Sequence, residues 1–255
     1  MIWELASELF GTFILVLLGD GVVANVGLAP RVASGGYSWL TITVGWCFAV
    51  AIACYICPLS NHLNPAVTLG LALRRGFPWS KVVPFWAAQM VGAFLGALGV
   101  FLTYRDGLVA AGLPNVWATG PGSVFGQAFF GAGTATALGH YSLITAFITE
   151  IVGTAILLCG VLASGNVKSG VGGLVVPFTV LAIGLSLGGP SGYAINPARD
   201  LGPRIFGAIV GTQGLFDGVY WLVAPIIGPL IGGAVGVFVF DWLVSGGLAR
   251  KAQKA

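Results

Sequence analysis

The amino-acid sequence predicts an all-α membrane protein with six transmembrane helices and two re-entrant half-helices, arranged as an inverted repeat of three spans. Composition is the first observation: of 255 residues, 57% are hydrophobic and only 7% are charged. Soluble domains carry roughly 25% charged residues, so most of this surface must face lipid. These numbers exclude a soluble enzyme and a disordered chain. The net charge of +3 is too small to indicate a nucleic-acid partner.

Apolar segment length is the second observation. Six segments are long enough to cross about 30 Å of hydrocarbon at about 1.5 Å per residue. They run over 5–26, 38–57, 82–103, 142–164, 171–188 and 218–244. Two further apolar segments, 64–73 and 196–207, have about half the length that a crossing needs, so each should enter and leave on one side. The first span lacks the basic residues that begin a signal peptide, and we expect it to be retained.

An internal repeat is the third observation. Three stretches of the first half recur in the second half in the same order: they start at Glu8 and Glu150, Asn64 and Asn196, and Val91 and Ile227. Each half contains three crossings, so the second half must be inverted relative to the first. The third pair of stretches carries glycines four residues apart, a spacing that allows close helix approach: Gly92 with Gly96, and Gly228 with Gly232.

The repeat divides a single channel domain, residues 1–255, into recognisable parts. The first repeat covers about 1–104, a connecting loop about 105–141, the second repeat about 142–248, and a short basic tail 249–255. The loop is rich in glycine and small residues, and four aromatic side chains should anchor it as an ordered surface loop: Trp117, Phe125, Phe129 and Phe130.

The distribution of Lys and Arg predicts the orientation. If both termini are cytoplasmic, so are seven basic residues: Arg74, Arg75, Lys81, Lys168, Arg250, Lys251 and Lys254. Only Arg31 and Arg105 then lie in outer loops. Cytoplasmic loops of membrane proteins carry the excess of positive charge, so this bias favours a multi-pass protein of the cell membrane with both termini inside.

Two Asn-Pro-Ala motifs should begin the half-helices: Asn64-Pro65-Ala66 and Asn196-Pro197-Ala198. Asn is a favoured N-cap, and Pro suits the first helical position. Half-helices that enter from opposite faces bring two positive dipole ends together at mid-membrane, where non-helical backbone must line a cavity. We expect the preceding loops to offer carbonyl oxygens to a pore from Asn61, His62, Leu63, Gly192, Ala194 and Ile195.

Such a pore favours neutral solutes that form hydrogen bonds. The two Asn side chains supply donors and the loops supply acceptors, whereas the facing dipole ends oppose cations, including protons. Arg199, next to the second motif, should also line the pore, because an ionisable residue at membrane depth is usually functional. His62 is interpreted either as a pore residue or as a hydrogen-bonded core histidine.

Glu8 and Glu150 are the other repeated charges. They could couple transport to protons, but we favour a structural role in which each carboxylate accepts backbone N–H groups of the nearby re-entrant loop. Cys54 and Cys57 form a C-x-x-C pair without a second pair or a His cluster. We interpret them as small buried hydrophobes, and we expect neither a metal site nor a cofactor.

These motifs resemble the aquaporin superfamily of major intrinsic proteins over nearly the whole chain. Asp200, directly after Arg199, resembles the glycerol-facilitator (aquaglyceroporin) branch. The resemblance implies a homotetramer with one pore per protomer, passive flow, and loop support by Asp200. It also implies a selectivity constriction at Trp46, Gly184, Tyr193 and Arg199. Water-specific members place His at the position of Gly184, so Gly should leave that side open and let Trp46 and Tyr193 form an aromatic corner opposite Arg199.

The sequence therefore predicts a passive transmembrane channel for glycerol and related small neutral solutes that also passes water. Within the channel class, the alternatives are a facilitator mainly for water, hydrogen peroxide, urea, dihydroxyacetone or protonated lactic acid. A proton-coupled transporter using Glu8, Glu150 and Asp20 belongs to a different class, and it is disfavoured because no carboxylate pair lies next to the motifs. No constellation typical of an intramembrane enzyme is recognisable, so we expect no catalytic activity.

Overall fold

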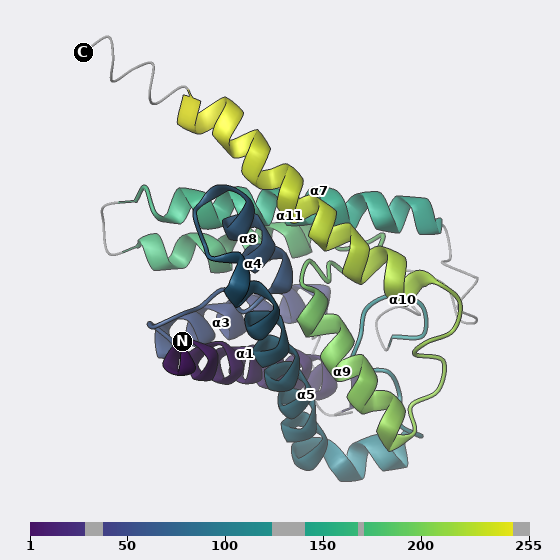
Figure 1. Ribbon diagram of the computed structural model, residues 1–255. Helices are drawn as coiled ribbons and strands as arrows, with labels where there is room; N and C mark the ends of the chain where they lie inside the picture. The colour runs from purple at the N-terminus through teal and green to yellow at the C-terminus, as the bar shows by residue number, and fades with distance from the viewer. Residues whose placement is uncertain (29–37, 124–140, 168–170, 247–255) are drawn as a thin grey trace.

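The computed structural model describes residues 1–28, 38–123, 141–167 and 171–246, in which the regular elements are helices (Figure 1). In chain order they are α1 (Ile2–Leu28), α3 (Trp39–Ile56), α4 (Pro65–Arg74), α5 (Trp79–Ala110), α7 (Leu143–Ser164), α8 (Gly172–Leu187), α9 (Pro197–Val210), α10 (Tyr220–Leu222) and α11 (Gly228–Phe240). Two π-helical turns extend the last span, η1 (Val223–Ile227) and η2 (Asp241–Ser245). The predicted all-helical membrane fold is confirmed.

Five helices in the described part of the chain are long and apolar enough to cross a membrane: α1, α3, α5, α7 and the segment Tyr220–Ser245. The sixth expected span, 171–188, is α8, whose 16 residues reach about 24 Å. It packs between α3 and α7. Helix α5 continues to Ala110, so the connecting segment begins later than the expected position 105.

The two halves use the same helix packing. Helix α1 packs along α5, and α7 packs along α11. A Cβ atom added to Gly92 would overlap the backbone carbonyl of Leu9, and one added to Gly232 would overlap that of Ile151. The repeated glycines therefore allow the backbones of the paired helices to touch, as their spacing indicated.

Each half-helix packs against a long helix of the other half. Helix α4 contacts α11, and α9 contacts α5 (Figure 1). Glycines again allow this approach, because a Cβ on Gly233 would lie 2.7 Å from the carbonyl oxygen of Ala66, and one on Gly202 would lie 2.6 Å from Cβ of Ala93. Because each half-helix packs against the opposite half, both are held in the interior of the bundle.

Ion pairs connect helix ends. Lys81 at the start of α5 pairs with Glu4 of α1 at 2.9 Å, while Arg74 and Arg75 at the end of α4 pair with Asp241 at 2.8 and 2.5 Å. Arg105, which was expected in an outer loop, lies on α5 because that helix continues to Ala110. Five further charges used to predict the orientation lie outside the described residues: Arg31, Lys168, Arg250, Lys251 and Lys254.

Trp117 anchors the described part of the connecting segment. Its side chain is completely buried, and its indole N–H donates to Oγ1 of Thr212 at 2.9 Å. The three phenylalanines expected to act alongside it, Phe125, Phe129 and Phe130, lie outside the described residues.

Candidate functional site

Both Asn-Pro-Ala motifs begin half-helices. Asn64 is the N-cap of α4, and its Oδ1 accepts the backbone N–H of Ala66 at 2.9 Å. Asn196 is the N-cap of α9, and its Oδ1 accepts the backbone N–H groups of Ala198 at 3.1 Å and Arg199 at 3.3 Å. Pro65 and Pro197 occupy the first helical positions, where a missing N–H costs nothing.

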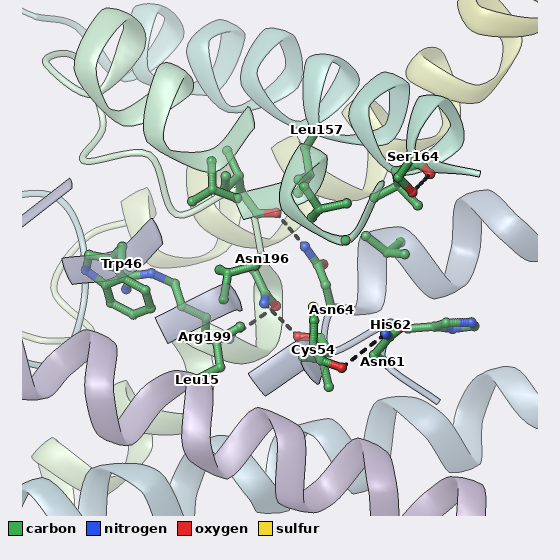
Figure 2. Close-up of a pocket in the computed structure, with 18 of the residues that line it drawn as sticks. Leu15, Trp46, Cys54, Asn61, His62, Asn64, Leu157, Ser164, Asn196 and Arg199 are labelled. Atoms are coloured by element: carbon green, nitrogen blue, oxygen red, sulfur yellow. Dashed lines mark hydrogen bonds between the residues drawn. The ribbon is translucent and has the colours of Figure 1, made fainter. Parts of the chain in front are cut away.

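The two asparagines also join the halves. Nδ2 of Asn64 donates to the carbonyl of Ile195, and Nδ2 of Asn196 donates to the carbonyl of Leu63, both at 2.8 Å (Figure 2). An amide nitrogen carries two N–H groups and a carbonyl oxygen has two lone pairs. Each asparagine thus keeps one donor for a solute, and the carbonyls of Leu63 and Ile195 keep only part of the acceptor capacity expected of pore-lining groups.

Left-handed backbone turns the loops at this point. Leu63 has φ = 52° and Ile195 has φ = 44°, a region that non-glycine residues rarely adopt. Tyr193 has φ = 41°, and Gly192 has φ = 85°. Such conformations cost free energy and persist only where surrounding contacts hold them.

Two buried carboxylates provide these contacts. Glu8 accepts the backbone N–H groups of His62 at 2.7 Å and Leu63 at 2.8 Å, and Glu150 accepts those of Ala194 at 2.8 Å and Ile195 at 2.7 Å. Glu8 receives two further bonds from side chains, Ser60 at 2.6 Å and Gln89 at 2.7 Å. Both carboxylates are fully buried and line neither of the cavities described below, which favours loop support over proton coupling.

Two cavities meet at three side chains. A central cavity of about 200 Å³ contains both asparagines, and a small cavity of about 40 Å³ lies against the segment 115–119. The residues common to both linings are Trp46, Tyr193 and Arg199. Figure 2 shows Trp46 and Arg199 at one end of the central cavity and His62 and Ser164 toward the other. These three side chains therefore lie where the two cavities meet, at the place where the sequence predicts a constriction.

The remaining predicted pore residues also line these cavities. The central cavity is lined by Asn61, His62, Leu63, Ala194 and Ile195, and the small one by Gly192. Apolar side chains make up much of the rest of the central wall, including Leu15, Val50, Val67, Leu157 and Val180. The central cavity thus combines residues of the two re-entrant loops with an apolar surface.

The arrangement at the constriction differs from the expected aromatic corner opposite a charge. The guanidinium of Arg199 lies over the Trp46 ring, 4.2 Å from its centroid, in cation–π geometry. Tyr193 instead meets Trp39 edge to face at 5.5 Å between ring centroids.

Gly184 does not leave one side of the pore open. A Cβ atom at this position would lie 2.8 Å from Cζ of Tyr193 and 2.8 Å from Cγ2 of Thr43, so these side chains fill the space. Gly184 lines neither cavity, and its carbonyl accepts the indole N–H of Trp39 at 3.0 Å. Its effect on the constriction is indirect: the absence of a side chain admits the Tyr193 ring.

The constriction retains unused hydrogen-bonding atoms. Nε1 of Trp46, Oη of Tyr193 and Nη1 of Arg199 are buried, and none has a hydrogen-bond partner among the described residues. Buried polar atoms are almost always bonded. Three such atoms where the cavities meet are suited to a solute that carries its own hydroxyl groups.

His62 satisfies parts of both interpretations. It lines the central cavity, yet Nδ1 lies 3.1 Å from Oγ1 of Thr68. Its ring also packs against Phe77 and Phe85, at centroid distances of 4.8 and 5.2 Å. One edge of the ring is thus held by the protein core.

Asp200 supports a different loop from the two glutamates. It accepts the backbone N–H and hydroxyl of Thr119 at 2.8 and 2.7 Å, and Nε of Arg204 at 2.8 Å. It therefore holds the connecting segment against α9. The spacing of Asp200 and Arg204, four residues apart on a helix, could have indicated this pair. Thr119, Trp39, Thr43 and Gln89 carry no comparable sequence signal.

No metal centre is found in the described part of the chain, where no three His, Cys, Asp or Glu side chains cluster. Cys54 and Cys57 are both free thiols. Cys54 lines the central cavity, and Cys57 is buried.

Comparison with known proteins identifies the family. Residues 1–240 match the family described as major intrinsic protein. The chain belongs to this family. It is 43% identical over 253 residues to "Glycerol uptake facilitator protein 3" of Lactiplantibacillus plantarum, covering 94% of this chain and 96% of that protein. It is 45% identical over 250 residues to "Probable glycerol uptake facilitator protein" of Thermotoga maritima, covering 93% and 97%.

A solved structure of another member has the same fold. The aquaglyceroporin from Plasmodium falciparum superposes on this major intrinsic protein with a TM-score of 0.80 at 30% sequence identity, covering 95% of this chain and 96% of that one. The resemblance inferred from the paired motifs is confirmed.

Proposed function

We propose that this major intrinsic protein is a passive channel for glycerol and related small neutral solutes, and that it also passes water. The observation that carries the proposal is the meeting of two cavities at Trp46, Tyr193 and Arg199, with unused donors at the junction. The names of its relatives, which are glycerol uptake facilitators, support glycerol as the solute.

The constriction has the two kinds of surface that a polyol needs. The ring of Tyr193 offers an apolar face to the carbon backbone, while N–H groups of Arg199 and Trp46 donate to hydroxyl oxygens. Beyond this point, the free amide N–H groups of Asn64 and Asn196 and the loop carbonyls exchange hydrogen bonds with the solute. A hydrated solute can thus replace its lost water contacts as it passes.

Cations do not gain comparable interactions to replace the water that they lose. The N-terminal ends of α4 and α9 meet at the two asparagines, and helix N-termini carry partial positive charge. Arg199 adds a full positive charge at the constriction. Cations, including protons, are therefore repelled along the same path that a neutral solute takes.

We extend the proposal to the assembly and its orientation. The protein is a multi-pass protein of the cell membrane, both termini are cytoplasmic, and four copies form a homotetramer with one pore in each protomer. The exposed apolar side chains of the long helices, such as Phe48, Val83 and Ile144, support contact with lipid or with other protomers.

Stopped-flow light scattering of proteoliposomes tests the function. We expect glycerol entry well above that of protein-free liposomes and independent of an imposed proton gradient. Val67→Trp fills the central cavity and should abolish the flux, whereas Val83→Trp, on an exposed site of α5, should not. Glycerol flux that requires a proton gradient, or that survives Val67→Trp, would refute the proposal.

A further inference from the structure

Asp20 is a buried carboxyl group that the proposed pore does not use. It lies on α1, its side chain is 1% exposed, and neither carboxylate oxygen has a hydrogen-bond partner among the described residues. An acidic residue inside a membrane protein is costly and usually functional, and a buried charge without compensation is strongly destabilising. The carboxyl group must therefore either hold a proton or lie near a positive group that balances its charge.

Asp20 lies on the part of α1 that packs against Trp46 and the small cavity. A Cβ atom on the preceding residue, Gly19, would overlap the six-membered ring of Trp46, so α1 supports the ring on which Arg199 stacks. One turn further along, Val23 lines the small cavity. Helix α1 also contacts α9, the helix that carries Arg199.

The charges around Asp20 leave one candidate for its partner. Arg199 and Asp200 are the charged groups that act on the Asp20 carboxylate. Asp200 is itself paired with Arg204 at 2.8 Å. Arg199 forms no ion pair within 4.0 Å in the described part of the chain. Of the charged groups that act on one another here, Asp20 and Arg199 are therefore the two without an ion pair among the described residues.

We propose that Asp20 is the counter-charge of Arg199 and a specificity-determining residue of the constriction. This inference rests on the proposed channel function. Asp20 offsets part of the positive field of Arg199 and lines neither cavity, so the remaining field and the two helix N-termini still repel cations. The pore can then use Arg199 as a hydrogen-bond donor while remaining closed to small anions, whereas rings of uncompensated Arg or Lys are what anion pores use.

Removing the Asp20 charge should make the pore permeable to small anions. Asp20→Asn keeps the size of the side chain but leaves Arg199 uncompensated, so we expect chloride entry into proteoliposomes to rise about tenfold, equivalent to about 1.4 kcal/mol of barrier. A chloride-quenched dye inside the vesicles, with valinomycin and potassium to balance charge, reports this flux. Asp20→Glu restores the carboxylate and should restore exclusion.

A matched control removes one carboxylate elsewhere. Asp241→Asn produces the same change in net charge at the far end of the last span, where Asp241 pairs with Arg74 and Arg75. We expect chloride exclusion to remain at the wild-type level. An equal rise in chloride flux in this variant would show that net charge, and not the position of Asp20, controls exclusion, and would overturn the proposal.

The coupling to Arg199 is tested by a double variant. Arg199→Val leaves the Asp20 charge uncompensated and should admit potassium, measured with a potassium-sensitive dye. Adding Asp20→Asn to Arg199→Val removes the remaining charge, so the potassium leak should fall and the protein should unfold at a higher temperature than the Arg199→Val variant. Additive leaks in the double variant would contradict the proposal.

Two results keep the inference separate from the proposed function. If wild-type vesicles pass no glycerol, the channel itself is refuted. If they pass glycerol but Asp20→Asn excludes chloride as well as the wild type does, only the role of Asp20 is refuted. Should Asp20→Asn fail to accumulate in the membrane, the double variant decides: restored accumulation supports charge balance, and continued failure rejects it.

Discussion

At the scale of single residues, the constriction depends on glycines that leave space for aromatic rings. Gly19 leaves space for the Trp46 ring, and the guanidinium of Arg199 stacks on that ring. Gly184 accommodates the ring of Tyr193. Of the four positions that the family resemblance implied for the constriction, Trp46, Tyr193 and Arg199 line both cavities and Gly184 lines neither. Their mutual contacts could not, because they depend on helix packing that no local pattern encodes.

Gly184→His tests this packing. The imidazole would need the space that the Tyr193 ring and the Thr43 methyl group now fill. The Tyr193 ring must therefore move into the pore. We expect glycerol flux to fall at least about tenfold while water flux is retained, as measured by stopped-flow scattering. Gly21→Ala is the control, because a Cβ there meets nothing within 4 Å. Unchanged glycerol flux in Gly184→His would contradict the assignment.

The loop carboxylates give a second prediction at this scale. Glu150→Gln keeps one acceptor oxygen for the two backbone N–H groups of Ala194 and Ile195, so one buried donor loses its partner. Such a loss costs about 1–3 kcal/mol. Thermal unfolding in detergent should therefore shift to lower temperature and glycerol flux should decline. An unaltered unfolding temperature would show that the loop holds its conformation without the carboxylate.

At the scale of helices, the sequence was most informative where the signal is local. Asn64-Pro65 and Asn196-Pro197 begin helices because cap and first-turn preferences act within three residues. The sequence was least informative about where α5 ends, because the connecting loop was expected from about residue 105 and the helix extends to Ala110. The role of Asp200 was also only partly visible, since its partner Thr119 is distant in sequence.

The glycine contacts give a prediction for helix packing. In Gly92→Ala, the added methyl group would overlap the carbonyl of Leu9 and force α1 and α5 apart. Overpacking of this kind costs about 1–3 kcal/mol, so the unfolding temperature in detergent should drop. Gly107→Ala, on the same helix, is the control because its Cβ lies 3.8 Å from the nearest atom. Equal stability of both variants would argue against close α1–α5 packing.

At the scale of the whole molecule, the inverted repeat could be predicted from sequence because matching stretches in two halves of three spans leave only one arrangement. The exchange of half-helices between the halves could not, since it depends on which surfaces meet after folding. Gly202 and Gly233 show how it is achieved: each lies against the opposite half.

The orientation gives a prediction at this scale. Reporter fusions that are active only in the cytoplasm should be active at both ends of the chain, because the basic residues cluster in the loops expected on that side. A fusion after Leu113, in the connecting segment between α5 and α7, should be inactive. Activity at that site, or inactivity at either terminus, would reverse the orientation.

The reciprocal bonds of Asn64 and Asn196 have a further consequence. Each asparagine donates to the residue that precedes the other, so the contact is isologous in the way that a two-fold dimer interface is. Neither half can complete this contact alone. The amide of Asn64 and the carbonyl of Leu63 bind partners more than 130 positions later in the chain, so both partners are synthesised long after them. A first half expressed by itself could form this contact only with a second copy, so its Asn64 amide and Leu63 carbonyl would mark the surface through which two such halves associate.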